Sequence, residues 1–274
     1  MIELSEKWWK RVVWVVLCGW ILLGFLLWQV PDGRMHVWFL DVGQGDSILV
    51  KTPLGHQILV DGGPGNVVVE RLGEVMPYFD GSIDMVVLTH PHADHVDGLV
   101  EVLSRYSVDS VLLTGVMDEY AGYIEFLKEI EDGGVDVYVA ESGMDFRFGD
   151  VYVDVIYPVE QIVGEEFSNL NNSSIGVVVS YGDNEILLTG DLEEEEEVGL
   201  VVGDVDIFKA GHHGSKTANT LELLRRAKPE MVVIQCGAEN KFGHPHVEAL
   251  ERFEEMGVEV VKRNDLDGTV EVVF

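Results

Sequence analysis

The sequence predicts an α/β fold in which two β-sheets pack face to face and helices cover their outer sides, preceded by one apolar helix. Three observations support this prediction. Residues 12–30 contain no charged side chain, residues 35–274 form two blocks that each pass from short strands to alternating strands and helices, and no low-complexity segment divides the blocks. The 274 residues suffice for one such domain with a buried core.

The apolar run at residues 12–30 is long enough to span a bilayer. Tryptophans stand near both of its ends, as in interfacial belts: Trp8, Trp9, Trp14 and Trp28. Basic residues precede it: Lys7, Lys10 and Arg11. The positive-inside rule therefore predicts a single-pass cell-membrane protein with residues 1–11 in the cytoplasm, a linker at 31–34 and an extracytoplasmic domain at 35–274. A cleavable signal peptide is the alternative, although no small-x-small cleavage motif follows the run.

The first block begins with β-branched and apolar runs separated by Gly and Asp turns, which predict strands at 35–42, 47–52 and 57–61. The turn at 53–55 predicts that the second and third strands are antiparallel. A strand–helix alternation then follows: helix 66–76, strand 83–89, a helix from Asp94, strand 108–114, helix 120–131 and strand 135–139.

The second block begins near Val151 and repeats this order. Strands at 175–181 and 185–189 flank Gly182-Asp183-Asn184, which is a hairpin signal. The block then continues with strand 205–209, helix 219–227, strand 231–235, helix 246–256 and strands 258–261 and 269–272.

Three histidines and an aspartate crowd into the stretch LTHPHADHVDGL at residues 88–99: His90, His92, Asp94 and His95. They follow a predicted buried strand and precede a helix, which places them at the carboxyl edge of a sheet, where ligands tend to bind. His90 and His92 point the same way on an extended segment, whereas Asp94 and His95 turn toward a second point about 3–4 Å away. Imidazole and carboxylate ligands suit Zn, Mn or Fe, so a two-metal site is predicted.

The H-x-H-x-D-H pattern resembles the signature of metallo-β-lactamase-fold hydrolases. Four further segments occur in the corresponding order: FLDVGQGDSILVKTPLGHQILVDGG, NNSSIGVVVSYGDNEILLTGD, DIFKAGHHGSKT and FGHPHVEALERF. Together they make residues 35–274 similar to the hydrolase domain of the ComEC family of DNA-uptake competence proteins. The resemblance implies a metallo-β-lactamase-like αββα sandwich, two divalent metal ions (Zn or Mn) and phosphodiester hydrolysis, with DNA as the expected substrate.

Asp191 ends the run ILLTGD, where the resemblance implies a carboxylate that bridges the two metals. Asp94 is expected to be both a metal ligand and a catalytic residue, and the two carboxylates supply negative charge to the site. The alternative role for Asp191 is a helix N-cap, because Leu192 is expected to begin a helix. The five glutamates at 193–197 are predicted to form a solvated first helical turn, which the helix macrodipole favours.

The motif GHHGS follows another predicted strand. His212 is expected to be a metal ligand and His213 a proton donor or substrate contact; a purely structural histidine pair is the alternative. Ser215 and Lys216, at or near a helix start, are expected to hold a phosphate oxygen, although a surface lysine is the default interpretation.

The motif GHPH precedes the last helix, and His244 or His246 is expected to complete the site, as a metal ligand or as a proton donor. Asn171 and Asn172 occupy the region where many members of the wider superfamily carry a third histidine for the first metal. This departure puts tight binding of the first metal in doubt and leaves part of its coordination to water or substrate.

Four polar residues at predicted strand ends lie on the same edge: Asp41, Gln44, Asp46 and Asp61. Asp61 is expected to orient a ligand histidine from outside the coordination shell. For Asp41 and Asp46, the alternative is a turn-forming role next to glycine.

The charge balance is extreme, with 18 basic and 49 acidic residues and a net charge of −31. Such a surface repels nucleic acid over most of its area and argues against a broad basic DNA-binding face. Adaptation to high salt is a second explanation. Cys18 and Cys236 fall in the apolar run and in a predicted buried strand, so the sequence indicates neither a disulfide nor a cysteine metal site.

The predicted function is therefore a membrane-anchored, dinuclear metal-dependent hydrolase, a phosphodiesterase or nuclease of the ComEC-like type. One alternative is an extracytoplasmic phosphodiesterase that acts on an envelope polymer or a small phosphodiester. The other is a non-catalytic metal-binding subunit that works with membrane partners in an uptake system, since one span cannot form a DNA channel. A discriminator between these functions is whether six basic side chains converge on the edge that carries the predicted metal ligands and form a local positive funnel there: Lys209, Lys216, Arg225, Arg226, Lys228 and Lys241.

Overall fold

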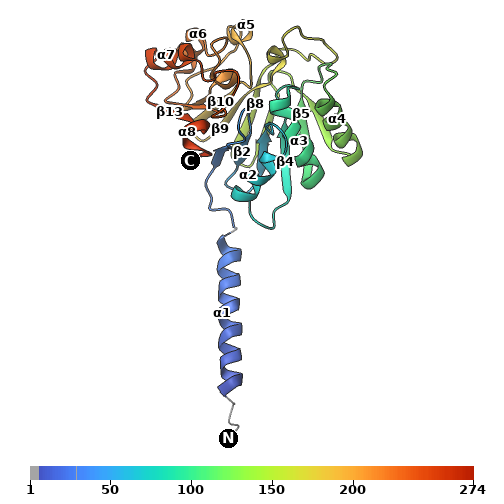
Figure 1. Cartoon of the computed structure of the whole chain (residues 1–274), viewed down its shortest axis with the longest axis vertical. Coiled ribbons are helices and arrows are strands. Elements are labelled where there is room, and N and C mark those ends of the chain that lie inside the picture. Colours follow the sequence, from blue (N-terminus) through green and yellow to red (C-terminus); the bar gives the residue numbers. More distant parts are fainter. Residues whose placement is uncertain (1–5, 29) are drawn as a thin grey trace.

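The computed structural model describes residues 6–28 and 30–274. Helix α1 (Glu6–Trp28) projects from one end of the folded domain (Figure 1). Its segment Trp8–Leu26 is long and apolar enough to cross a membrane. Helix α1 contains the predicted span as far as residue 28. Residues 1–5 of the predicted cytoplasmic segment and residue 29 of the predicted span lie outside the described residues.

The first sheet has seven strands in the order β14-β1-β2-β3-β4-β5-β6. Neighbours from β14 to β3 run antiparallel, and those from β3 to β6 run parallel. The strands are β1 (His36–Phe39), β2 (Ile48–Lys51), β3 (Gln57–Val60), β4 (Ser82–Val87), β5 (Ser107–Leu113), β6 (Asp136–Val139) and β14 (Val270–Val273). Three helices cover its outer face: α2 (Val67–Val75), α3 (Ala93–Arg105) and α4 (Ala121–Gly133).

The second sheet also has seven strands, in the order β13-β12-β11-β10-β9-β8-β7. Pairs from β7 to β10 are antiparallel and pairs from β10 to β13 are parallel. The strands are β7 (Asp145–Phe148), β8 (Val151–Tyr157), β9 (Gly176–Tyr181), β10 (Asn184–Leu188), β11 (Ile207–Lys209), β12 (Met231–Ile234) and β13 (Val260–Arg263). Helices α6 (Leu221–Ala227) and α7 (Val247–Glu255) cover its outer face, and the remaining short helices are η1 (Leu170–Ser173), α5 (Glu194–Glu197), η2 (Gly211–Gly214) and α8 (Asn264–Asp267).

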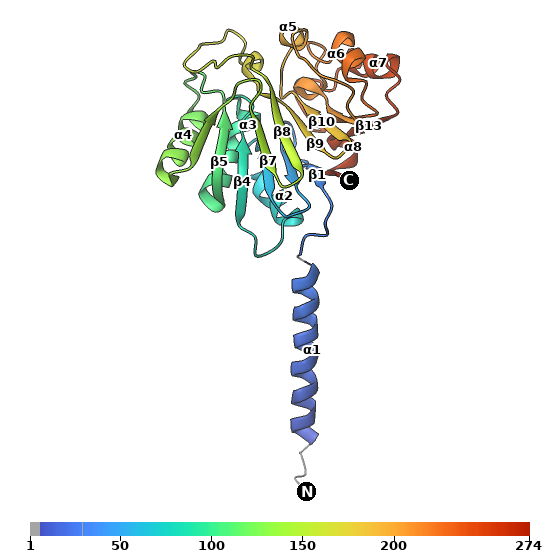
Figure 2. The same ribbon diagram turned by 180° about the vertical axis from the view of Figure 1, so that it is seen from behind.

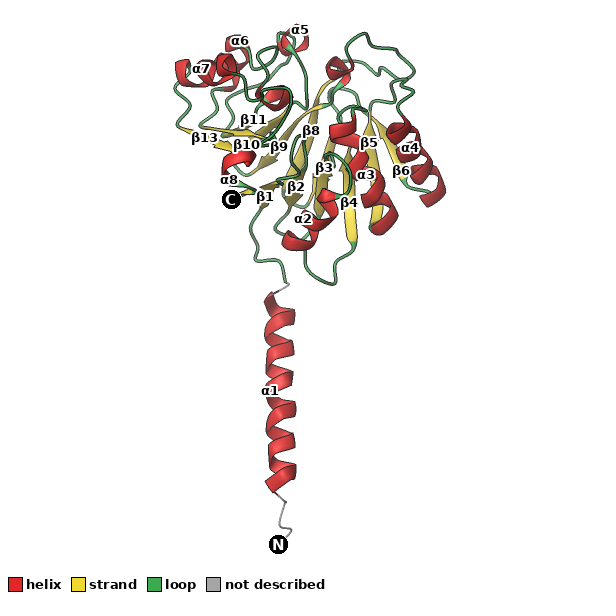
Figure 3. Cartoon of the chain, in the orientation of Figure 1, coloured by secondary structure: helices red, strands yellow, loops and turns green. Residues whose placement is uncertain are grey.

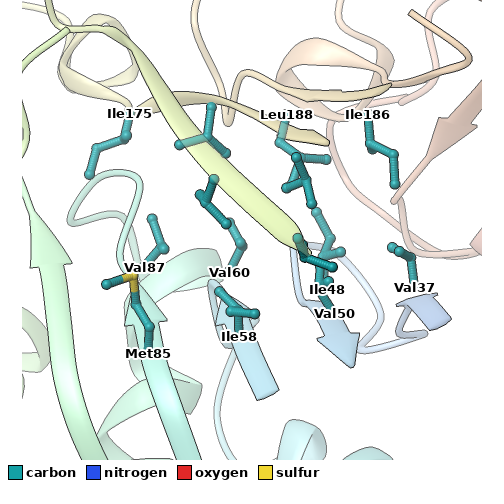
Figure 4. Packing of buried hydrophobic residues seen from close by; sticks show 14 of the residues in the cluster. Val37, Ile48, Val50, Ile58, Val60, Met85, Val87, Ile175, Ile186 and Leu188 are labelled. Carbon is teal, nitrogen blue, oxygen red and sulfur yellow. The ribbon is translucent and has the colours of Figure 1, made fainter. Parts of the chain in front are cut away.

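The two sheets face each other, with helices on both flanks (Figures 2 and 3). Alternate residues of one strand serve two cores: Ile58 and Val60 of β3 point between the sheets, whereas Leu59 packs under the helices. Figure 4 shows this inter-sheet core, where Met85 and Val87 of β4 lie across from residues of the second sheet. Burial on both faces explains why these strands read as unbroken apolar runs. The predicted αββα sandwich is confirmed.

Three elements differ from the prediction. The second sheet begins with β7, six residues before the predicted start at Val151, because an edge strand pairs back onto β8. The helix expected from Leu192 is only the single turn α5. Strand β14, predicted within the second block, crosses to the first sheet and pairs antiparallel with β1, since β1 offers a free edge there.

Candidate metal centre

The candidate site lies where several parallel strands of both sheets end, at the edge of the domain opposite α1. The histidine cluster follows β4, Asp191 follows β10, His212 and His213 follow β11, and His244 lies beyond β12. The fold therefore brings together segments that are as much as 150 residues apart along the chain, as expected for the carboxyl edge of an open sheet.

Asp191 lies at the centre of this group. Its Oδ2 atom is 3.2 Å from Nε2 of His213, 3.3 Å from Nε2 of His95, 3.9 Å from Nε2 of His212 and 4.0 Å from Nε2 of His90. The side chain is buried, which by itself raises the pKa of the carboxyl, but His213 and His95 outweigh burial and hold this pKa well below its usual value. The carboxylate is therefore ionised among imidazoles, the place expected for a bridging ligand.

His95 is held in position by Asp61. Its Nδ1 atom lies 2.7 Å from Oδ2 of Asp61, which also accepts from the Thr89 hydroxyl at 2.7 Å. This contact turns Nε2 of His95 toward Asp191. It requires α3 to approach the turn after β3 closely: a Cβ atom at Gly98 would come within 1.9 Å of the Gly62 carbonyl oxygen. Asp61 thus contacts the ligand candidate His95 from the side away from Asp191, where a residue that orients a metal ligand is expected.

His90 and His92 lie side by side, with Nε2 of His90 2.9 Å from Nδ1 of His92. Nδ1 of His90 is 3.2 Å from the hydroxyl of Ser174, which also accepts from the Asp191 backbone amide. Burial holds the pKa of His90 well below its usual value, so this imidazole is neutral at physiological pH. A neutral imidazole is the protonation state that binds metal.

His213 is buried and has both ring nitrogens directed at site residues. Nδ1 donates to the backbone oxygen of Gln235 at 3.0 Å and lies 3.1 Å from Oδ1 of Asp46. That arrangement fixes the tautomer and leaves Nε2 facing Asp191 at 3.2 Å and Oδ2 of Asp94 at 3.4 Å. Asp46 is therefore part of the site and not only a turn residue.

Lys209 is fully buried and forms an ion pair with Asp46. Its Nζ atom also lies 3.7 Å from Oδ1 of Asp191 and donates to the Gly190 carbonyl oxygen at 3.1 Å. Burial alone lowers the pKa of a lysine, but Asp46 and Asp191 outweigh it and raise the pKa of Lys209. This internal cation balances part of the carboxylate charge of the site, a role that the sequence did not predict.

His212 faces the site differently from His213. Its Nδ1 atom is 2.9 Å from Oε1 of Glu193, its Nε2 atom is 3.9 Å from Asp191, and its side chain is partly exposed. Both histidines have left-handed backbone conformations, with φ of 47° and 54°, which non-glycine residues rarely adopt outside functional sites. The geometry thus favours the inner position for His213 and the outer one for His212, opposite to the sequence-based assignment, and both roles stay predictions.

Asn171 and Asn172, both in η1, contact His212 and Glu193. Nδ2 of Asn171 lies 3.4 Å from Nδ1 of His212 and donates to Glu193 at 3.1 Å. Asn172 accepts from the Glu193 backbone amide at 3.0 Å. Both asparagines therefore position Glu193 and His212, at the point where the wider superfamily is expected to have a histidine.

His244 and His246 border the same centre. The ring of His244 is buried, with its centroid 5.3 Å from that of His212 and 6.0 Å from that of His213. Burial and the neighbouring histidines lower the pKa of His244 to about 4. His246 is the N-cap residue of α7, and its Nδ1 accepts from the backbone amide of Lys216.

The remaining predicted residues lie at the margin. Asp41 accepts from the Gly43 amide at 3.2 Å, which is the turn-forming role. Gln44 accepts from the Gly237 amide at 3.2 Å and so joins the loops of the two sheets. Ser215 is buried against the Thr217 hydroxyl at 2.9 Å, and the Lys216 side chain is exposed.

The donor set fits a divalent cation. Nε2 of His95 and Nε2 of His213 are buried and have no hydrogen-bond partner among the described residues, although both face the Asp191 carboxylate. Buried polar atoms without partners are costly, so their convergence needs a ligand to explain it. Four overlapping groups among the described residues have ligand atoms close enough to share an ion. Two of them are His90, His95 and Asp191, and Asp94, His95 and His213; the other two contain Asp46. Nitrogen and carboxylate donors suit Zn or Mn.

The predicted solvated glutamate turn is wrong for two of its members. Glu193 pairs with His212, and Glu197 is fully buried. The Glu197 carboxylate accepts from the backbone amides of Asn219 at 2.6 Å and Thr220 at 2.7 Å, and burial raises its pKa. The prediction failed because the helix macrodipole concerns only the end of the helix itself, whereas the amides that bind Glu197 come from a loop more than 20 residues away in the chain.

We expect Glu197→Ala to lower the free energy of unfolding by about 2–4 kcal/mol, because two buried backbone amides lose their acceptors. Urea unfolding followed by circular dichroism of the detergent-solubilised chain measures this loss. Glu194→Ala is the matched control, since Glu194 is exposed, and its effect should stay within about 0.5 kcal/mol. Equal stability of the two variants would contradict a supporting role for Glu197.

The six basic side chains do not all converge on the metal edge. Lys209 reaches it from within. Arg225 lies 3.8 Å from Glu255, Lys228 lies 2.9 Å from Asp204, and Arg226 donates to carbonyl oxygens of residues 197, 198 and 200. Lys216 and Lys241 remain beside the GHPH loop. Of the six basic side chains, these two lysines are therefore the exposed ones beside the candidate site, and a positive funnel formed by all six is not observed among the described residues.

Residues 40–237 match the family model of the metallo-β-lactamase superfamily. The chain is 28% identical over 272 residues to ComE operon protein 3 of Bacillus subtilis, covering 90% of this chain and 34% of that protein. It is 28% identical over 269 residues to Recombination protein 2 of Haemophilus influenzae (95% and 31%) and 29% identical over 270 residues to Competence protein ComA of Neisseria gonorrhoeae (94% and 35%). The chain spans about a third of the length of these curated relatives, and the resemblance to ComEC-type proteins is confirmed.

Solved structures agree on the fold. The metallo-β-lactamase fold protein YhfI from Bacillus subtilis aligns with a TM-score of 0.57 at 14% identity, covering 87% of this chain and 100% of YhfI. CmlA, a diiron β-hydroxylase from Streptomyces venezuelae, aligns with a TM-score of 0.59 at 16% identity, covering 89% of this chain and 55% of CmlA. Fold, motif order and family match lead to one conclusion: the chain belongs to the metallo-β-lactamase superfamily.

Proposed function

We propose that the chain is a membrane-anchored hydrolase that uses two divalent metal ions to cleave phosphodiesters, with DNA as its first candidate substrate. The observation that carries this proposal is the position of Asp191, whose Oδ2 atom faces imidazole nitrogens from two distant segments, at His90 and His95 and at His213. A carboxylate between two groups of nitrogen donors is the arrangement that a two-metal hydrolytic site requires.

In this proposal His90 and His92 would hold one ion, Asp94, His95 and His213 would hold the other, and Asp191 would supply a carboxylate to both. Bound divalent ions polarise the scissile phosphate and lower the pKa of a water molecule to near neutrality. Asp61 and Asp46 orient the rings of His95 and His213 through their Nδ1 atoms. The assignment of His213 as a ligand replaces the sequence-based choice of His212.

We assign proton donation to His212. Oε1 of Glu193 lies 2.9 Å from its Nδ1 atom and fixes the orientation of the ring, while Nε2 lies 3.9 Å from Oδ2 of Asp191 at the centre. A histidine that is paired with a carboxylate on one nitrogen and faces the reacting atoms with the other suits a general acid. His244, with its pKa lowered to about 4, is neutral at pH 7 and is better suited to accept a hydrogen bond from substrate.

The choice of DNA rests on the relatives and on one feature of the rim. Three of the relatives are named for competence or recombination. Phe242 is 51% exposed, its ring stacks on that of His244 with centroids 5.7 Å apart, and Nζ of Lys241 lies 5.2 Å from its centre. An exposed aromatic ring with a neighbouring cation is how proteins bind single-stranded nucleic acid.

The test is turnover by the full chain, loaded with Mn²⁺ or Zn²⁺, on single-stranded DNA, RNA and bis(p-nitrophenyl) phosphate. We expect DNA cleavage that chelation abolishes. Phe242→Ala should lower kcat/KM on DNA by about tenfold, the value of one stacked base, and leave the small diester unchanged. Val247→Ala, at another exposed apolar residue nearby, is the matched control. A chain that binds two metals and cleaves neither these substrates nor a choline-bearing diester is instead a non-catalytic subunit.

A second candidate substrate is a small phosphodiester that carries a cationic or apolar group. The observation that favours it is a cavity of about 740 Å³ near the carboxyl end of β5. Its lining combines three carboxylates with two aromatic rings: Asp118, Glu119, Glu166, Tyr123 and Phe167. Such a lining repels a polyanion and attracts a cation. Faster hydrolysis of choline-bearing diesters than of DNA would select this candidate.

We also propose that α1 anchors the chain with its amino end in the cytoplasm and the hydrolase outside, because the basic residues precede the apolar segment. Protease added to intact cells should therefore digest the catalytic domain and leave a short membrane-embedded fragment. Complete protection of the domain in intact cells, with digestion only after permeabilisation, would reverse this topology.

A further inference from the structure

Three large apolar side chains are exposed at the end of the domain next to α1. Tyr78 is 80% exposed and Phe79 69% exposed, both in the loop between α2 and β4, and Leu54 is 68% exposed in the turn between β2 and β3. No core cluster includes them. A soluble surface seldom gathers such residues at one place unless they have a partner.

The strand register places all three at one edge of the first sheet. His36, which begins β1, is opposite Lys51, which ends β2, so the turn that carries Leu54 lies beside the start of the domain. Strands β3 and β4 are parallel, with Ile58 paired to Met85, so the loop before β4 lies at the same edge. The histidine cluster follows the other end of β4, roughly 20 Å away by the length of that strand.

The same edge adjoins the end of α1. Residues 29–35 join α1 to β1 and reach no more than about 30 Å even when fully extended. The ring of Phe25, in the last turns of α1, packs edge-on against Tyr78 at 6.5 Å and Phe79 at 6.1 Å between centroids. In Figures 1 and 2 the loop between α2 and β4 reaches down toward this end of the helix.

A hollow of about 270 Å³ lies between the two loops and the linker, lined by Pro31, Lys51, Gly55, Pro77, Phe79 and Asp80. Apolar rings next to a lysine, immediately above an apolar helix, match the composition of a membrane interface, where aromatic rings sit at headgroup level and basic side chains meet phosphate.

We infer that the loops at residues 53–55 and 77–80 rest in the lipid headgroup layer and hold the domain upright on the bilayer. This inference rests on the proposed anchoring by α1. The occupant of this surface is the bilayer into which α1 inserts, because Phe25 of α1 contacts Tyr78 and Phe79 directly and so holds this loop at the level where the apolar helix ends. The metal edge then faces away from that bilayer, so its substrate arrives from the aqueous phase and not as a headgroup of the same membrane.

The test uses nitroxide labels on the full chain in phosphatidylcholine nanodiscs, with accessibility to oxygen and to a soluble nickel chelate measured by power saturation. The native Cys18, in the middle of α1, reports anchoring, and Cys236 is buried. In a Cys18→Ser background, Gly81→Cys reports the loop, since position 81 is exposed and a Cβ atom there meets nothing within 4 Å. Met117→Cys, 56% exposed beyond the far end of β5, reports the metal edge.

We expect the labels at 18 and 81 to be shielded from nickel and open to oxygen, and the label at 117 to be open to nickel. Tyr78→Ser with Phe79→Ser should abolish the shielding at 81 and leave that at 18 unchanged. Val159→Ser with Val163→Ser, two exposed valines elsewhere, should change neither. A nickel-accessible label at 81 with a shielded label at 18 would overturn the inference that the loops rest in the headgroup layer and leave the anchoring by α1 intact. A nickel-accessible label at 18 would overturn both the anchoring and the placement of the loops.

Discussion

Asp191→Ala is expected to lose bound metal and activity together. The Oδ2 atom of Asp191 faces both histidine groups, so its removal takes a ligand from each ion at once. Loss of an outer-shell partner alone commonly costs 10–100-fold in metal affinity or activity, and we expect a shared ligand to cost more than about 10²-fold in turnover. Elemental analysis of the purified chain gives the metal content, and turnover on the preferred substrate gives the activity.

Asp41→Ala is the matched control for this variant. Asp41 lies at the same edge of the first sheet, but among the residues that the structure describes its carboxylate accepts only from the amide of Gly43, two residues along its own turn. We expect normal metal content and turnover within a few-fold of the unsubstituted chain. Two metals per chain in Asp191→Ala would contradict the role of a shared ligand. The helix-cap alternative from the sequence is not available, because α5 has Glu193 as its N-cap.

His213→Ala is expected to lose metal, whereas His212→Ala is expected to keep it and turn over slowly. His213 is buried with Nε2 facing both Asp191 and Asp94, as a ligand must be. His212 is partly exposed and paired with Glu193, so its loss should remove proton donation and lower turnover by about 10²–10⁴-fold. The same two measurements, metal content and turnover, separate the roles.

Leaving-group dependence provides the control for the His212 role. A general-acid defect shrinks on substrates with a better leaving group, because less protonation is needed, whereas a binding defect does not. Glu193→Gln should reproduce part of the His212→Ala defect with the metal still bound. A metal-free His212→Ala together with a fully loaded His213→Ala would restore the original assignment, and two loaded, active variants would make the pair structural.

Local pattern was enough to predict the parts of the site that lie on one segment. The spacing of His90, His92, Asp94 and His95 after a buried strand defines them within a few residues, and the hairpin signal at 182–184 does the same for β9 and β10. Alternation of apolar residues and turn signals involve only a few neighbouring residues, so they can be recognised in the sequence alone.

The features that were missed depend on partners far along the chain. Lysine is nearly always exposed, so nothing beside Lys209 indicates that it is buried against Asp46, a residue that belongs to the other sheet. Glu197 has the same local signature as the exposed Glu194, and only the amides of Asn219 and Thr220 distinguish them. Two left-handed backbone conformations decide which of His212 and His213 takes the buried inner position, and neighbouring residues do not specify these conformations.

The pairing of β14 with β1 has a consequence for how this domain is built into larger proteins. Met35 and Phe274 exchange backbone hydrogen bonds of 3.2 and 2.9 Å, so both ends of the folded unit leave it at one point, far from the metal edge. Closely placed ends favour circular permutation and insertion into a host chain, because either end then serves as the attachment. A longer membrane protein can therefore carry this unit from its first strand or from its last, and the edge with the candidate metal site keeps the same orientation toward the surroundings.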